Sequence, residues 1–257
     1  MLVLLSCAKT MSETSKVKVP LNTVPRFQKE ASEIALQMSQ FAVGDLERLL
    51  RVNAKIAVEN YKRYQAFHAE TTPELPALLA YTGIVFKRLN PKDFSAEDFG
   101  YAQEHLRLTS FCYGLLRPLD VIRAYRLEGD VVLPELGNQT LFSYWRSRLT
   151  DTFIEDIRSA GGILCNLASD EMKSLFDWKR VESEVRVVTP EFHVWKNGKL
   201  ATIVVYTKMS RGEMTRFILK NKIGNPEELK GFSWEGFEFD ESLSDERKLV
   251  FINGMGE

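Results

Sequence analysis

The sequence contains few cysteines and no long run of apolar residues, and both shortages narrow what the protein can be. The three cysteines, Cys7, Cys112 and Cys165, lie far apart, and no two have the C-x-x-C spacing of a zinc or redox motif. The three histidines are equally scattered. Neither a disulfide framework nor a metal site is indicated, so we expect no cofactor and a reduced, cytoplasmic setting.

Membrane segments, linkers and a strong net charge are also missing. No run approaches the roughly 20 apolar residues of a membrane-spanning helix, so no membrane partner is expected. No stretch rich in proline, serine or glycine divides the 257 residues, which predicts a single domain over residues 1–257. The net charge is -1, so any affinity for nucleic acid must come from a local patch of basic residues.

The first residues contain a misleading pattern. Leu4-Leu5-Ser6-Cys7 resembles a lipoprotein processing site, but the apolar run before it covers only residues 2–5. A secretory signal needs a basic leading region and about 7 to 15 apolar residues. We interpret residues 2–5 as a strand that is buried on both faces and delivers Ser6 to Thr10 to its carboxyl end.

The remaining pattern is typical of an α+β fold, a single mixed domain of helices and sheet. Helical spacing covers residues 27–68, as two short helices joined by a tight turn or as one long helix. A capping box at Ser95 and Asp98 starts a helix expected to run to about Leu116. Further strands are expected at residues 163–167 and 185–189, a hairpin around Asn197-Gly198 with strands 192–195 and 200–207, a helix at 210–223, and short strands within 232–251.

Basic residues follow several of these elements, which predicts a basic cleft. Lys9 follows the first strand, Asp170 follows the strand 163–167, and Arg211 lies at the expected start of a helix. Residues beyond strand ends tend to meet in one crevice, and a helix start adds donor amides. The predicted cleft contains Lys9, Arg117, Arg126, Asp170 and Arg211. The alternative is structural: Arg117 pairs with Asp120, and Arg126 pairs with Glu128 or Asp170.

Residues 43–68 form a second candidate site, a helix-hairpin-helix-like segment. Paired short helices with exposed turn amides can grip phosphates without reading bases. The glycines usual in such a turn are missing, and Asn53 stands where one is expected, although asparagine tolerates the left-handed conformation. A solvated surface hairpin is the alternative interpretation. The candidate DNA-binding residues are Arg48, Arg51, Asn53, Lys55, Lys62 and Arg63.

Six short motifs, taken in this order, resemble the bacterial YaaA family of peroxide stress resistance proteins. They are Ser6 to Thr10, Tyr81-Thr82-Gly83, Tyr113 to Asp120, Tyr125 to Glu128, Asn166 to Glu171 and Ser210 to Met214. The resemblance implies a cytosolic protein of the hydrogen peroxide response with a mixed fold called the cannonball fold. It also implies a positively charged cleft and a helix-hairpin-helix that binds duplex and branched DNA.

The chain departs from the family pattern at three places. Cys7 stands where the first motif usually has proline, the segment 251–253 lacks a basic residue common there, and the hairpin lacks glycines. The first departure is expected to loosen the loop that carries Lys9, and the second to remove one charge from the cleft. The third, the lack of glycines, is expected to affect the affinity of the hairpin for DNA more than its fold.

Two hypotheses follow for the function. The first is a DNA-binding protein that protects or helps repair DNA under peroxide stress by contacting backbone phosphates of duplex or branched DNA. The second is an enzyme that acts on a nucleotide or another phosphorylated small molecule in the cleft, with Lys9 as nucleophile or clamp and Asp170 as general base. A role in iron control follows from the stress association alone, since the sequence offers no ligand set.

Overall fold

The strand Leu2–Leu5 (β1) lies inside an eight-stranded mixed sheet, and all four of its residues are buried. The computed structural model describes residues 1–196 and 198–254. The strand order is β11-β12-β9-β8-β1-β3-β4, and β10 pairs with β9. Bounds are β3 (Leu106–Ser110), β4 (Gly114–Leu116), β8 (Ile163–Asn166), β9 (Arg186–Lys196), β10 (Lys199–Ala201), β11 (Phe237–Asp240) and β12 (Lys248–Asn253).

The five inner strands run parallel, and antiparallel strands lie at the edges. β12, β9, β8, β1 and β3 are parallel neighbours, whereas β11, β10 and β4 each pair antiparallel. Parallel strands have both faces covered, which explains why β1 is a continuous apolar run. Two small two-stranded sheets lie outside this sheet, β2 (Glu74–Pro76) with β5 (Val121–Arg123), and β6 (Val132–Leu133) with β7 (Gln139–Thr140).

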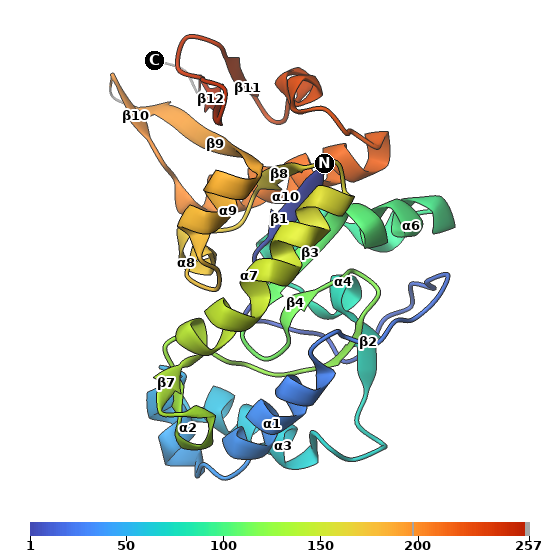
Figure 1. The fold of residues 1–257 in the computed structure, drawn as a ribbon, viewed down its shortest axis with the longest axis vertical. Coiled ribbons are helices and arrows are strands. Elements are labelled where there is room, and N and C mark those ends of the chain that lie inside the picture. Colours follow the sequence, from blue (N-terminus) through green and yellow to red (C-terminus); the bar gives the residue numbers. More distant parts are fainter. Residues whose placement is uncertain (197, 255–257) are drawn as a thin grey trace.

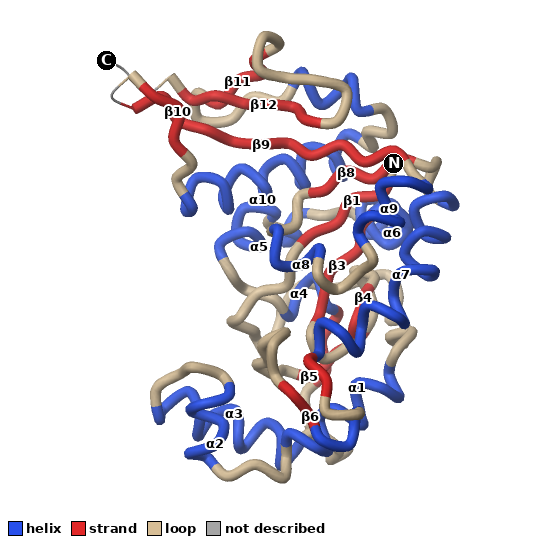
Figure 2. The backbone as a smooth tube through the Cα atoms, turned by 60° about the vertical axis from the view of Figure 1, so that its left-hand side comes forward, coloured by secondary structure: helices blue, strands red, loops and turns tan. Residues whose placement is uncertain are grey.

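Helices cover both faces of the sheet, and a separate helical group lies at one end of the molecule. α7 (Leu141–Ser159) and α9 (Trp178–Glu184) pack on one face, and α10 (Val204–Asn221) with α5 (Ile84–Leu89) on the other (Figure 2). α1 (Gln28–Met38), α2 (Val43–Leu49) and α3 (Ala54–Ala66) form the end group (Figure 1). The remaining helices are α4 (Ala77–Ala80), η1 (Pro91–Asp93), α6 (Ala96–His105), η2 (Pro134–Leu136), α8 (Asp170–Lys173) and η3 (Pro226–Gly231). No helix in the described part of the chain is both long enough and apolar enough to cross a membrane.

Several expectations from the sequence are confirmed. Mixed helices and sheet, the buried first strand, the strand at 163–166 and the short strands of the tail are all present. The capping box of α6 forms as expected, because the Ser95 amide donates to Asp98 Oδ2 at 2.8 Å and the Asp98 amide donates to Ser95 Oγ at 3.1 Å. β9 and β10 form the expected hairpin, but Asn197 of its turn lies outside the described residues.

The expectation of one helix from Ser95 to about Leu116 is wrong. The helix ends at His105, and residues 106–110 form β3, which pairs in parallel with β1. Leu106 and Leu108 are fully buried there. The ladder beside β1 and the burial of these leucines outweigh the helical spacing of the sequence, since tertiary context overrides local propensity.

Two boundaries in the second half of the chain also differ from the expectation. Residues 186–196 form one continuous strand instead of two, and the strand after the hairpin ends at Ala201. α10 then begins at Val204 instead of Ser210. Arg211 is therefore the eighth residue of the helix, beyond its first two turns, where the backbone amides are already used within the helix.

The segment 27–68, expected to form two short helices or one long helix, contains three helices, because α1 precedes the hairpin at residues 43–68. The hairpin itself consists of α2, α3 and a tight turn. The residue in the left-handed conformation is Arg51, with φ of 49°, and not Asn53. Asn53 has φ of -74° and instead caps α3, because its side-chain oxygen accepts a hydrogen bond from the Ile56 amide at 3.0 Å. Asparagine is a favoured residue at this position, so the sequence supplies a cap where a glycine was expected.

Gly212 allows α10 to pack closely against α5. A Cβ atom at this position would lie 2.3 Å from the carbonyl oxygen of Val85 and 2.8 Å from Cβ of Arg88. Neither the backbone of α5 nor the start of a side chain can move away easily. The glycine is therefore required by the distance between the two helices.

We expect Gly212→Ala to lower the free energy of unfolding by about 2 kcal/mol, because the added methyl group overpacks the α5–α10 contact. The midpoint of urea denaturation measures the change. Gly100→Ala is the control, since Gly100 is exposed in α6 and its Cβ would have no neighbour within 4 Å. This variant should be more stable by about 0.5–1 kcal/mol. Equal midpoints for the two variants would contradict the packing argument.

Candidate functional site

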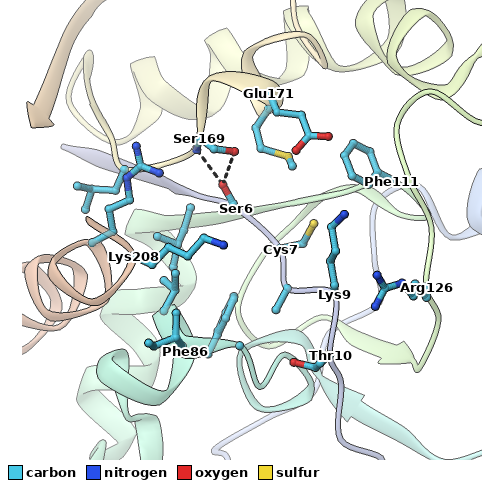
Figure 3. Close-up of a pocket in the computed structure, with 18 of the residues that line it drawn as sticks. Ser6, Cys7, Lys9, Thr10, Phe86, Phe111, Arg126, Ser169, Glu171 and Lys208 are labelled. Atoms are coloured by element: carbon cyan, nitrogen blue, oxygen red, sulfur yellow. Dashed lines mark hydrogen bonds between the residues drawn. The ribbon is translucent and has the colours of Figure 1, made fainter. Parts of the chain in front are cut away.

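A pocket of about 330 Å³ lies at the carboxyl ends of β1 and β8, between α5, α8 and α10. We call it the central pocket (Figure 3). Its apolar lining includes Phe86, Phe111, Leu127 and Met172. Its polar lining consists of Ser6, Cys7, Lys9, Thr10, Tyr125, Arg126, Ser169, Glu171, Lys208 and Arg211.

Two serines join the strand ends that form the base of the pocket. Ser6 follows β1 and Ser169 follows β8, and these strands are parallel neighbours. The Ser169 amide donates to Ser6 Oγ at 2.9 Å, and Ser6 Oγ donates to Ser169 Oγ at 3.3 Å (Figure 3). These bonds hold the two loops together, so the side chains that follow them enter one space.

Lys9 and Arg126 share one buried carboxylate. The Lys9 ammonium group donates to both oxygens of Glu128, at 2.8 and 2.7 Å, and an Arg126 terminal nitrogen lies 3.8 Å from Glu128. The Glu128 side chain is 3% exposed, whereas that of Lys9 is 59% exposed. Nε of Arg126 is buried without a hydrogen-bond partner in the described structure. Glu128 thus fixes both cations at the pocket wall and leaves part of each free.

The opposite wall carries two further cations from α10. Lys208 and Arg211 are three residues apart on this helix, which places them on the same face. Neither forms an ion pair within residues 1–196 and 198–254, and the buried Nε of Arg211 has no hydrogen-bond partner there. Burial lowers the pKa of Arg211, and the charge of Asp170 opposes this effect. Figure 3 shows Lys208 pointing into the pocket.

The pocket has a surplus of positive charge. Four cations line it, Lys9, Arg126, Lys208 and Arg211, together with one carboxylate, Glu171. Glu128 behind Lys9 adds a second carboxylate, so two positive charges remain uncompensated within this group. A buried guanidinium nitrogen without a partner is costly, and an anion in the pocket would provide the missing acceptor.

A network of buried hydroxyl groups supports the pocket from below. The Tyr125 hydroxyl lies 2.7 Å from that of Tyr81 and 2.6 Å from Ser110 Oγ. Burial raises the pKa of both tyrosines well above the usual value, so they remain neutral donors. Gly83 allows the backbone at the start of α5 to approach Ala8 closely, because a Cβ there would lie 2.9 Å from Cβ of Ala8. The loop after β1 is thereby held close to the start of α5.

Two of the five residues predicted for the cleft do not line this pocket. Arg117 pairs with Asp120 at 2.9 Å and donates to the carbonyl of Val24, which is the structural alternative. Asp170 pairs with Lys173 at 2.7 Å, and its side chain is 93% exposed. This hydrogen bond lowers the pKa of Asp170. Lys9, Arg126 and Arg211 do lie together, and Arg126 also has the Glu128 partner that was considered.

The sequence interpretation missed Lys208 and Glu171. Glu171 is the carboxylate that lines the pocket in place of its neighbour Asp170. Lys208 could have been found from its spacing to Arg211, but the helix was expected to begin two residues after it. The spacing of three residues indicates one helix face only if both residues lie in the helix, and the expected start at Ser210 left Lys208 outside it.

Cys7 points into the pocket but is not a reactive thiolate. Burial raises its pKa to about 12, although a hydrogen bond with Thr109 acts in the opposite direction. Burial likewise raises the pKa of Cys112 and Cys165. At neutral pH all three are thiols, which react slowly with peroxide. In the described part of the chain, no three His, Cys, Asp or Glu side chains gather where a metal ion could be held.

Most basic residues of the hairpin are paired with acids. Arg48 binds Asp45, Arg51 binds Asp130 through two hydrogen bonds at 2.7 and 2.9 Å, and Arg63 binds Glu13 and Glu59. Lys55 and Lys62 are exposed, and the described residues include no ion-pair partner for either. The uncompensated charge of this segment therefore lies on α3.

The hairpin is attached to the segment that forms the pocket wall. The Tyr64 hydroxyl of α3 donates to the carbonyl of Arg126 at 2.6 Å, and Tyr64 is fully buried. The pair of Arg51 with Asp130 adds a second connection. Residues 125–130 thus contact the central pocket on one side and the hairpin on the other.

Comparison with known proteins gives full-length matches. Residues 1–243 match the family model described as "Peroxide stress protein YaaA". A UPF0246 protein of Bacteroides thetaiotaomicron is 96% identical, and one of Bacteroides fragilis is 76% identical, each over the whole of both chains. A UPF0246 protein of Saccharophagus degradans is 34% identical over 98% of each chain. The motif resemblance is thereby confirmed, and the chain belongs to the peroxide stress protein YaaA family.

Proposed function

We propose that the protein binds DNA in the peroxide stress response and supports its protection or repair. The proposed contact is a helix-hairpin-helix formed by α2 and α3, which grips the backbone of duplex or branched DNA. The observation that carries this proposal is the position of Lys55 and Lys62, both exposed and without acid partners in the described structure, on the helix that follows the turn.

The geometry of the turn supports phosphate binding. Asn53 caps α3 through the Ile56 amide, which leaves the amides of Ala54 and Lys55 at the helix start outside the intrahelical ladder. The positive end of the helix dipole and Lys55 lie at the same place. A phosphate here would meet backbone donors and a side-chain charge together, with no need to read bases.

The paired arginines of the hairpin do not exclude a role in binding. Arg51 is 64% exposed and its partner Asp130 is 49% exposed. An exposed ion pair contributes about 0–1 kcal/mol, so a phosphate can compete with the carboxylate. Arg48 is in the same situation, whereas Arg63 is largely covered and holds two acids. Arg51 and Arg48 are thus the secondary contacts, after Lys55 and Lys62.

We expect Lys55→Gln combined with Lys62→Gln to weaken binding to labelled duplex and four-way-junction DNA about tenfold at low salt. The reason is the loss of two phosphate contacts, which should also reduce the slope of log affinity against log salt by about 1.8. Lys179→Gln is the control, since Lys179 is exposed on α9 away from the hairpin. Binding that is absent in the wild type at low salt, or unchanged in the double variant, would refute the hairpin assignment.

A second candidate function is supported by the central pocket. We infer that it binds a phosphorylated small molecule, because two positive charges and the Nε atoms of Arg126 and Arg211 have no acceptor in the described structure. Apolar residues such as Phe111 line the same space and suit the less polar part of a nucleotide. Lys9, held by Glu128, is suited to an electrostatic role, and Glu171 replaces Asp170 as the nearest candidate for proton transfer.

We expect inorganic phosphate and nucleoside monophosphates to raise the melting temperature of the wild type, since a ligand that binds the native state stabilises it. Arg211→Gln should weaken this binding by about 10- to 100-fold, the usual effect of losing a charge-assisted hydrogen bond. Arg117→Gln serves as the control, because Arg117 is tied to Asp120 outside the pocket. Equal ligand-induced shifts in wild type and Arg211→Gln would rule out the pocket as the binding site.

A further inference from the structure

A second hollow, which adjoins the central pocket, is lined by four lysines. It has a volume of about 910 Å³ and lies between the loop at residues 12–18 and the segment from α4 to η1. Lys16 and Lys18 line it from the loop, and Lys87 and Lys92 line it from the helical side. We call it the lysine groove. Neither the motifs nor the hairpin includes any of these lysines.

The charges of the lysine groove are uncompensated within the described structure. All four lysines are exposed, and none forms an ion pair with a described residue. None of the described residues that line the groove is acidic. The acids nearest to them in the sequence are already engaged, because Glu13 binds Arg63 and Asp93 binds Arg216. Four positive charges therefore face one groove in a chain whose net charge is -1.

Backbone hydrogen bonds hold the two walls of the groove at a fixed separation at one end. The Ser12 amide donates to the carbonyl of Ala80 at 2.8 Å, and the Thr82 amide donates to the carbonyl of Thr10 at 3.0 Å. Met11 and Tyr81 form an isolated bridge between them. These backbone bonds fix the shape of the groove at this end. Leu78, Phe86 and Phe94 are among its apolar lining residues.

We propose that the lysine groove binds the backbone of one unpaired DNA strand. Cations on both walls can contact successive phosphates of a strand that lies between them, which is how grooves for single strands attract their ligand. A duplex is far too wide to enter a hollow of this size, so its phosphates can meet only an outer surface such as the hairpin. The proposal rests on DNA as the ligand of the proposed function and adds which form of DNA the protein engages.

The position of the groove beside the central pocket supports a single strand. Phe86 lines both hollows, and Thr82 in the groove is followed directly by Gly83 in the pocket. The groove therefore adjoins a second cationic space with apolar walls. An unpaired nucleotide can leave the stack and enter such a space at little cost, whereas a paired base must first be unstacked.

An acidic protein segment is the competing occupant of the groove, because lysine ammonium groups attract carboxylates as well as phosphates. A nucleic-acid strand carries a negative charge on every nucleotide, which matches lysines on both walls of the groove. The arginines Arg63 and Arg216, whose acid partners lie next to the groove in the sequence, are already paired. The charges open to a strand are therefore those of the lysines.

The experiment measures binding of a labelled oligothymidylate by fluorescence anisotropy at several salt concentrations. Two variants each remove one wall, Lys16→Gln with Lys18→Gln, and Lys87→Gln with Lys92→Gln. The matched control is Lys196→Gln with Lys199→Gln, two exposed lysines on β9 and β10 outside the groove. Each wall variant should weaken binding about tenfold and reduce the salt slope by about 1.4, the value for two phosphates of a single strand. The control should bind like the wild type.

Other outcomes separate this proposal from the hairpin assignment. If duplex binding is absent but oligothymidylate binding responds to the wall variants, the groove stands and the hairpin falls. If the Lys55 and Lys62 variant loses duplex binding while wall variants bind oligothymidylate normally, the groove assignment is wrong. Absence of oligothymidylate binding at low salt also overturns it. So does equal displacement by polyglutamate, which would indicate an acidic protein segment.

Discussion

One buried carboxylate, that of Glu128, joins the wall of the central pocket to the segment that contacts the hairpin. Glu128 is 3% exposed, accepts two hydrogen bonds from Lys9 and lies 3.8 Å from Arg126, so it joins the loop after β1 to the segment 125–130. The same segment accepts the Tyr64 hydroxyl from α3 and pairs with Arg51 through Asp130. A buried acid must be paired, and this requirement places the pocket wall and the hairpin in a defined relation.

Positive charge is concentrated locally on the molecule. The chain is nearly neutral as a whole, yet within its described residues cations without an acid partner gather on α3, in the central pocket and in the lysine groove. Elsewhere on the described chain many arginines are paired, as Arg117 is with Asp120 and Arg107 with Asp156. Local patches of this kind attract phosphates without making the protein strongly basic. Burial raises the pKa of all three cysteine thiols, so they are poorly suited to direct reaction with peroxide.

The sequence predicted the elements whose local and tertiary signals agree. β1 was evident from its apolar run, the start of α6 from its capping box, and Lys9 from its place after the first strand. Arg211 does line the pocket, although its helix begins earlier than expected. The prediction from sequence was wrong where tertiary contacts determine the secondary structure. Residues 106–110 are an example, because they pair with β1 instead of extending α6. The lysine groove could not be predicted, because Lys16 and Lys87 are brought together by the loop bonded to Ala80 and Thr82. The residue in the left-handed conformation was expected at Asn53. It is Arg51, because Asn53 caps α3 with its side chain.

The most direct test of this account is a double-mutant cycle with Lys9→Met and Glu128→Gln, followed by urea denaturation. The two changes are expected to be coupled by about 1 kcal/mol or more, because either single change leaves one member of the pair without its partner. The double variant should therefore be more stable than the sum of the single effects. Strictly additive effects would show that the Glu128 pair does not hold the pocket wall in place.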